Sequence, residues 1–211
     1  MTKVKPITAG WILAIIYLVG VVGFILPQTK KLMPSLVWVN LMFTVVVLLA
    51  YHKKWSREIV LALFLIGASG FLLEVIGIKT GRIFGYYQYG PTLGYALWDT
   101  PLMMFVNWLT TVYVTRQVAE MVSKDIVFTS LMAAFLMVLL DYFLEPFAIR
   151  YGLWLWNSGV VPMQNYIAWF VAGFFLQYLF IRGVKFPTNK LSLPVYLIQL
   201  AFFIALFLIH R

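Results

Sequence analysis

The sequence contains no cysteine, and only 11% of its 211 residues are charged. The absence of cysteine excludes disulfide bonds, thiolate metal ligands and cysteine nucleophiles. The scarcity of charge, together with a hydrophobic content of 63%, excludes a water-soluble domain of this length. We therefore expect a single transmembrane helical domain over residues 1–211, with no separate soluble part.

The sequence also lacks the common motifs of cofactor binding. Neither G-x-G-x-x-G nor G-x-x-x-x-G-K-[ST] occurs, which removes the usual flavin, nicotinamide and nucleotide sites. His52 and His210 stand at the ends of apolar runs and form no cluster, so a histidine-bound metal centre is not expected. Any reaction should be redox-neutral and need no metal and no cofactor.

Seven apolar runs divide the chain, and each is about long enough to cross the hydrocarbon core of a bilayer as a helix. They span residues 7–26, 33–51, 59–78, 98–118, 126–148, 162–181 and 191–209. We therefore predict an all-α fold, a polytopic membrane bundle of about seven transmembrane helices. Residues 79–97 are too polar and too rich in glycine to cross, so we expect a loop at the membrane interface, where tyrosine is favoured.

Basic residues predict the orientation of the bundle. The 16 Lys and Arg divide ten to six between the two sides of this topology, and the side with ten includes the amino terminus. Because basic loops stay in the cytoplasm, we expect a cytoplasmic amino terminus in a prokaryotic cell membrane. These loops also explain the net charge of +9, so we expect a lipid bilayer as the partner and no nucleic acid.

Four of the seven acidic residues fall in one leaflet, because helix direction alternates along the chain. These four are Glu74, Asp99, Asp141 and Glu145. A carboxylate in hydrocarbon costs about 3 kcal/mol on insertion scales, so acids at this depth suggest a functional site.

Asp141 and Glu145 are spaced i, i+4 and project from one face of the fifth helix. Two carboxylates this close cannot both ionise cheaply in a low dielectric, so we expect one to hold a proton. A protonated acid in an apolar cleft can donate that proton, and an ionised neighbour stabilises positive charge. The alternative is a pair of acids that only locks helices together, neutralised by Arg150 or held by hydrogen bonds from Asn165, Gln164 and Tyr142.

Further polar and aromatic side chains are candidates for substrate contact. Asp99 precedes Pro101 by two residues, and its alternative role is that of a helix N-cap. Asn107 follows about two turns deeper on the same helix. Asn165 and Trp169 begin the sixth helix, where the Trp169 ring could contact a substrate or stabilise a cation.

Trp154 and Trp156 lie between the fifth and sixth apolar runs. Tryptophan is enriched at membrane interfaces. We expect these two side chains, together with Tyr151, to form an interfacial belt first and a binding surface second.

Three blocks of sequence resemble one known family. They are 74–89 (EVIGIKTGRIFGYYQY), 97–108 (LWDTPLMMFVNW) and 140–170, which contains D-x-x-x-E-P and P-x-x-N-Y-x-x-W-F. These blocks are similar to those of the integral-membrane carotenoid biosynthesis family, which includes the carotenoid 1,2-hydratases and the bisanhydrobacterioruberin hydratases. The resemblance spans roughly residues 65–175. The family pattern has a hydrophobic residue at the position of Asp99 and often aspartate at that of Glu145.

The resemblance implies a carotenoid hydratase acting on a lycopene or γ-carotene type of substrate. Such an enzyme adds water to the terminal C=C of an acyclic ψ-end group and produces a tertiary alcohol. Asp141 or Glu145 would deliver the proton, while the other carboxylate or Glu74 would stabilise the cation and deprotonate the water. Tyr86 would join Asn165 and Trp169 in orienting the end group and the water.

Two other functions fit the same residues. A membrane lycopene cyclase would use the same protonation but close a ring, giving a product of unchanged mass. A carotenoid carrier or transporter would use the acids for proton coupling or helix locking; no internal repeat of the kind common in transporters is evident.

Overall fold

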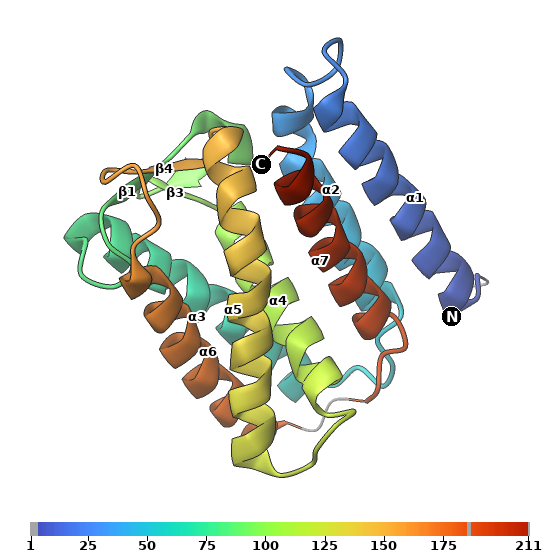
Figure 1. Ribbon diagram of the computed structural model, residues 1–211. Helices are drawn as coiled ribbons and strands as arrows, with labels where there is room; N and C mark the ends of the chain where they lie inside the picture. The colour runs from blue at the N-terminus through green and yellow to red at the C-terminus, as the bar shows by residue number, and fades with distance from the viewer. Residues whose placement is uncertain (1–3, 185–186, 211) are drawn as a thin grey trace.

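The computed structural model describes residues 4–184 and 187–210, and these residues form a bundle of seven α-helices (Figure 1). The helices are α1 (Pro6–Ile25), α2 (Met33–Ala50), α3 (Arg57–Thr80), α4 (Met103–Ala119), α5 (Ile126–Arg150), α6 (Met163–Gly183) and α7 (Ser192–Ile209). Five of them, α1, α2, α3, α5 and α7, are long and apolar enough to cross a membrane. The predicted all-α membrane bundle is confirmed.

Six of the seven helices begin and end within two residues of the apolar runs that predicted them. Their ends follow local chemistry: the Ser56 hydroxyl accepts a hydrogen bond from the Ile59 amide at the start of α3, and the Asp125 carboxylate accepts one from the Phe128 amide at the start of α5. At the other end of α3, Gly81 adopts φ +64°, a left-handed conformation that glycine adopts without strain. The chain therefore leaves α3 in a tight turn about two helical turns beyond Glu74.

The fourth helix begins later than the sequence predicted. We expected it from residue 98, with Asp99 as a possible N-cap, but α4 begins at Met103 and follows Leu102 with no side-chain cap. Trp98 and Asp99 both have positive φ and form the turn between strands β2 (Ala96–Leu97) and β3 (Thr100–Pro101). This hairpin, rather than a helix, occupies the segment, so the expected cap is wrong.

Helix α5 stands in the middle of the bundle and packs against α4, α6 and α7 (Figure 1). Helix α3 packs against α4 on one side, and α1 packs against α2 and α7 on the other. The two ends of the chain lie at opposite ends of the bundle (Figure 1). This arrangement gives α3, α4, α5 and α6 a common interior.

A small sheet covers one end of that interior, where the sequence predicted only a loop. Strand β1 (Tyr87–Tyr89) comes from the α3–α4 connection and β4 (Trp154–Trp156) from the α5–α6 connection. They pair antiparallel, with Tyr87 opposite Trp156 and Tyr89 opposite Trp154. A 3-10 turn, η1 (Pro91–Leu93), follows β1. The sheet thus joins the α3–α4 connection to the α5–α6 connection (Figure 1).

Candidate active site

Three buried carboxylates meet at the covered end of the bundle. Glu74 of α3 is 3% exposed, and Asp141 and Glu145 of α5 are 6% and 1% exposed. All three line one small cavity of about 20 Å³, together with Asn107 of α4 and, from α6, Asn165 and Trp169. A cavity of this volume has about the room that one water molecule needs.

Glu74 accepts hydrogen bonds from three aromatic side chains. The hydroxyls of Tyr87 and Tyr89 donate to Oε2, the second of them over 2.9 Å, and the indole N–H of Trp108 donates to Oε1 over 2.9 Å. Three donors on one carboxylate favour its ionised form. The fixed aromatic rings also hold Glu74 in one orientation.

Glu145 likewise accepts three hydrogen bonds, and all of them come from N–H groups. The indoles of Trp154 and Trp156 donate to Oε2 over 3.0 and 2.9 Å, and the Asn165 amide donates to Oε1 over 3.2 Å. An N–H donor cannot accept a proton from a carboxylic acid in return. The surroundings of Glu145 therefore suit an anion.

Asp141 accepts fewer hydrogen bonds than Glu74 and Glu145 do. The Asn165 amide nitrogen donates to Oδ2 over 2.8 Å, so this one nitrogen joins Asp141 to Glu145. The second oxygen, Oδ1, forms no hydrogen bond with the residues that the structure describes. Of the three carboxylates, Asp141 accepts the fewest hydrogen bonds, and a proton on its Oδ1 would displace no donor.

Alternation along the two paired strands explains how four donors reach two carboxylates. Side chains two residues apart on a strand point to the same face. Tyr87 and Tyr89 of β1 therefore share one face, as do Trp154 and Trp156 of β4, and the antiparallel register places the two pairs opposite each other. The Tyr87 and Trp156 rings lie 4.9 Å apart between centroids.

The two tyrosines act as donors throughout the physiological pH range. Burial, followed by the nearby charge of Glu74, raises the pKa of the Tyr87 and Tyr89 hydroxyls above that of a free tyrosine. Both phenols therefore keep their protons, which they share with the Glu74 carboxylate.

Trp108 connects Glu74 to the sixth helix. Its ring stacks on that of Trp169, with centroids 4.1 Å apart and planes inclined by 3°. This position requires a glycine on α3, because a Cβ atom at Gly70 would lie 2.1 Å from Cγ of Trp108. The close approach of α3 and α4 thus places both the donor to Glu74 and the aromatic wall of the cavity.

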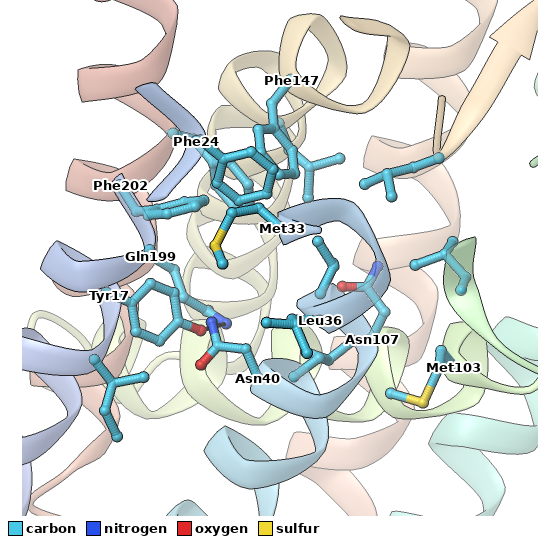
Figure 2. Close-up of a pocket in the computed structure, with 18 of the residues that line it drawn as sticks. Tyr17, Phe24, Met33, Leu36, Asn40, Met103, Asn107, Phe147, Gln199 and Phe202 are labelled. Atoms are coloured by element: carbon cyan, nitrogen blue, oxygen red, sulfur yellow. Dashed lines mark hydrogen bonds between the residues drawn. The ribbon is translucent and has the colours of Figure 1, made fainter. Parts of the chain in front are cut away.

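A larger, mostly apolar cavity of about 260 Å³ adjoins the small one (Figure 2). It lies among α1, α2, α4, α5 and α7 and is lined mainly by aliphatic and aromatic side chains. Met104, Asn107 and Trp154 line both cavities. The Asn107 amide forms no hydrogen bond among the described residues. The carboxylates are therefore adjacent to a space suited to hydrocarbon.

The structure gathers most of the residues that the sequence suggested. Glu74, Asn107, Asp141, Glu145, Asn165 and Trp169 line the small cavity. Tyr86 and Asp99 lie elsewhere. Tyr86 immediately precedes β1, is 66% exposed and packs against Gly81. Asp99 lies in an exposed hairpin turn and pairs with Lys79.

Five further residues donate hydrogen bonds to the carboxylates: Tyr87, Tyr89, Trp108, Trp154 and Trp156. From the sequence, Trp154 and Trp156 were expected to form an interfacial belt first and a binding surface second, and neither tyrosine was singled out. The signal that could have found four of them is the alternating Y-x-Y and W-x-W pattern, which is typical of short strands. Within residues 4–184 and 187–210, no group of three or more histidine, aspartate or glutamate side chains is arranged to hold a metal ion.

Comparison of the sequence with known proteins identifies the family of this chain. The model of the family described as "Carotenoid biosynthesis protein" matches residues 35–210, a longer stretch than the resemblance predicted. A bisanhydrobacterioruberin hydratase from Haloarcula japonica is 27% identical over 141 residues, which cover 61% of this chain and 46% of the relative. The chain therefore spans about half the length of that curated relative. No solved structure matches the chain. Because the family model covers well over half of the sequence, the chain belongs to the carotenoid biosynthesis protein family.

Proposed function

We propose that this chain is a carotenoid hydratase that adds water to the terminal C=C of an acyclic carotenoid end group. The proposal rests mainly on one observation: three carboxylates line one small cavity beside an apolar cavity, and they accept different numbers of hydrogen bonds. Membership of a carotenoid biosynthesis family and similarity to a hydratase support the substrate class and the reaction.

Asp141 is the proton donor in this proposal. Three carboxylates around one small cavity repel each other when all are ionised, so at least one of them holds a proton. Glu74 and Glu145 each accept three hydrogen bonds, and Asp141 accepts one. The proton therefore resides on Asp141, whose Oδ1 lies free of protein donors.

Proton transfer from Asp141 to the less substituted carbon of the double bond leaves a tertiary carbocation on the other carbon. The ionised carboxylates of Glu74 and Glu145 stabilise that positive charge, because they lie in a site of low dielectric. The face of Trp169 adds a cation–π contribution. The Trp108 ring stacked behind it keeps the indole in place.

Water then completes the reaction. A molecule in the small cavity attacks the carbocation and forms the C–O bond of a tertiary alcohol. Its surplus proton passes to Glu74 or Glu145, and a proton returns to Asp141 before the next cycle. The net change is the addition of one water, with no oxidant, metal or cofactor consumed. Asn107 and Asn165 provide amide groups that orient the water and the end group.

The larger cavity receives the hydrocarbon end of the substrate. Its lining from Phe147, Phe202, Leu140 and similar side chains has no charge. Its volume lies just below the about 300–1,000 Å³ of sites for drug-sized ligands, so it takes the end group while the polyene extends into lipid. With a cytoplasmic amino terminus, the site lies in the outer leaflet, near enough to the interface for water to enter.

The experiment is to express the chain in cells that make lycopene or γ-carotene and to analyse the carotenoids by mass spectrometry. We expect a product heavier by one water, with its oxygen derived from ¹⁸O-labelled water rather than from O₂. The double variant Asp141→Asn, Glu145→Gln should abolish conversion. Glu58→Gln, which changes an exposed carboxylate at the other end of α3, is the matched control and should convert normally.

Three results would overturn the proposal. A product of unchanged mass with a new ring would make the chain a cyclase. Recovery of intact substrate bound to the purified protein would make it a carrier. Full conversion by the double variant would remove the carboxylates from the chemistry.

A further inference from the structure

The larger cavity opens at the surface of the bundle between α1 and α2. Of the described side chains that line it, only Val19 of α1 and Leu36 of α2 are also well exposed at the surface, by 63% and 40%. The lining from α4, α5 and α7 is buried or half-buried. Both α1 and α2 are long and apolar enough to cross a membrane, so an opening between them faces hydrocarbon. We call this opening at Val19 and Leu36 the α1–α2 window.

Two contacts between the helices bound the window. Toward the covered end of the bundle, a Cβ atom on Gly23 would lie only 2.4 Å from the sulfur of Met33, so the helices touch there. Toward the middle of the helices, the hydroxyls of Tyr17 and Thr44 form a hydrogen bond over 3.1 Å. Tyr17 and Gly23 are about 9 Å apart along α1. Val19 lies between them, so the window is closed at both ends.

Between these two contacts the helices pack against different neighbours. Helix α1 stands at the edge of the bundle and packs against α7, where a Cβ atom on Gly20 would lie 3.2 Å from the ring of Phe202 (Figure 1). Helix α2 packs instead against α4 and the 3-10 turn η1. Neither helix fills the space behind Val19 and Leu36, and that space is the cavity.

The cavity leads from the window to the carboxylates. Leu36 and Asn107 both line it (Figure 2). Asn107, Met104 and Trp154 line the small cavity of the three carboxylates as well. A hydrocarbon chain that passes the window therefore meets a mostly apolar space whose inner wall adjoins the reacting groups.

We propose that the polyene chain of the carotenoid enters from the lipid through the α1–α2 window and stays bound there while its end group reacts. The inference rests on the proposed function, because the end group must reach the carboxylates. The rim side chains Val19 and Leu36 present only hydrocarbon, as a polyene requires. The cavity of about 260 Å³ is smaller than the sites of drug-sized ligands, so the rest of the polyene has to leave it through an opening.

The absence of cysteine allows a label to be placed at one position. A photoreactive diazirine group is attached to Val19→Cys or to Leu18→Cys in nanodiscs that contain lycopene, and the crosslinked products are identified by mass spectrometry. Leu18 is the matched control, because it is 62% exposed on the same helix but lines neither cavity. We expect the label on Val19→Cys to capture carotenoid and the label on Leu18→Cys to capture lipid. Capture of lipid alone by both labels, or equal capture of carotenoid by both, would overturn the inference.

A kinetic test narrows the window. Val19→Trp and Leu36→Trp enlarge its rim side chains, and the controls Leu18→Trp and Val39→Trp change side chains of nearly equal exposure on the same two helices. A side chain that competes with the polyene for space acts like overpacking, so kcat/KM for lycopene should fall by about tenfold in the rim variants and stay normal in the controls. Equal kcat/KM values in the rim and control variants would contradict the window.

The crosslinking experiment separates this inference from the proposed function. Carotenoid captured by the label on Val19→Cys supports the window even if no carotenoid is hydrated. Hydration by a chain whose label on Val19→Cys captures only lipid contradicts the window and leaves the proposed function standing.

Discussion

Gly70→Ala tests how the packing of two helices positions the site. The added Cβ would lie 2.1 Å from Cγ of Trp108, whereas non-bonded carbons rest about 3.5–4.0 Å apart, so α3 and the Trp108 ring must separate by about 1.5 Å. Overpacking of this kind costs about 1–3 kcal/mol. Loss of the 2.9 Å hydrogen bond from Trp108 to Glu74 adds about 1 kcal/mol, and the better helix propensity of alanine offsets about 1 kcal/mol.

The net loss is about 2 kcal/mol, which lowers the melting temperature of a chain of this length by about 4–8 °C. The measurement is thermal unfolding of the detergent-solubilised protein, followed by intrinsic tryptophan fluorescence. Carotenoid conversion should fall as well, because Glu74 and Trp169 lose their support. Gly10→Ala in α1 is the control, since its nearest contact would be an ordinary 3.7 Å to Cβ of Pro194. Equal melting temperatures and equal conversion in the two variants would refute the reasoning.

Three further substitutions probe separate parts of the account. Tyr89→Phe keeps the ring but removes a hydrogen-bond donor to Glu74. The rate of conversion should fall by about 3- to 30-fold while the protein still folds normally. Conversion at the normal rate would show that this donor is dispensable. Asp99→Asn breaks the ion pair with Lys79, in which the Asp99 and Lys79 side chains are 73% and 52% exposed. Conversion should therefore not change, and the free energy of unfolding should change by at most about 1 kcal/mol. A loss of conversion would show that Asp99 takes part in the reaction. Ser56→Ala removes the N-cap of α3 and should cost about 1 kcal/mol in thermal unfolding without altering the product, whereas an unchanged melting temperature would contradict the capping role.

The helices could be predicted from the sequence because a bilayer imposes a minimum length on any apolar segment that crosses it. The gathering of Glu74, Asp141 and Glu145 could be predicted as well. Because helix direction alternates along the chain, α3 and α5 run in the same direction, and the acids stand near the carboxyl end of each. Both features follow from helix length and direction and do not depend on the detail of side-chain packing.

The sheet could not be predicted in the same way. Strands β1 and β4 have three residues each and are separated in the sequence by two α-helices, α4 and α5, so no local pattern predicts that they pair. Their tyrosines and tryptophans looked like an interfacial belt, which their position at the end of the bundle also fits. Only the register between the strands shows that Tyr87, Tyr89, Trp154 and Trp156 turn their polar groups toward the carboxylates.

The start of α4 was missed for a related reason. Leu97 and Trp98 extend the apolar run toward the preceding loop, so composition alone favours a helix from there. The positive φ angles of Trp98 and Asp99 instead reverse the chain in a hairpin. Asp99 therefore lies at the surface in that turn, and the acids that line the cavity come from α3 and α5.

The central claim is that Asp141 holds the proton while Glu74 and Glu145 are ionised. Infrared spectroscopy of the substrate-free protein tests it most directly, through the C=O stretching band of a protonated carboxylic acid. The account predicts that this band is present in the unaltered chain, disappears in Asp141→Asn and remains in both Glu145→Gln and Glu74→Gln. A band that survives in Asp141→Asn and disappears in Glu145→Gln would contradict it.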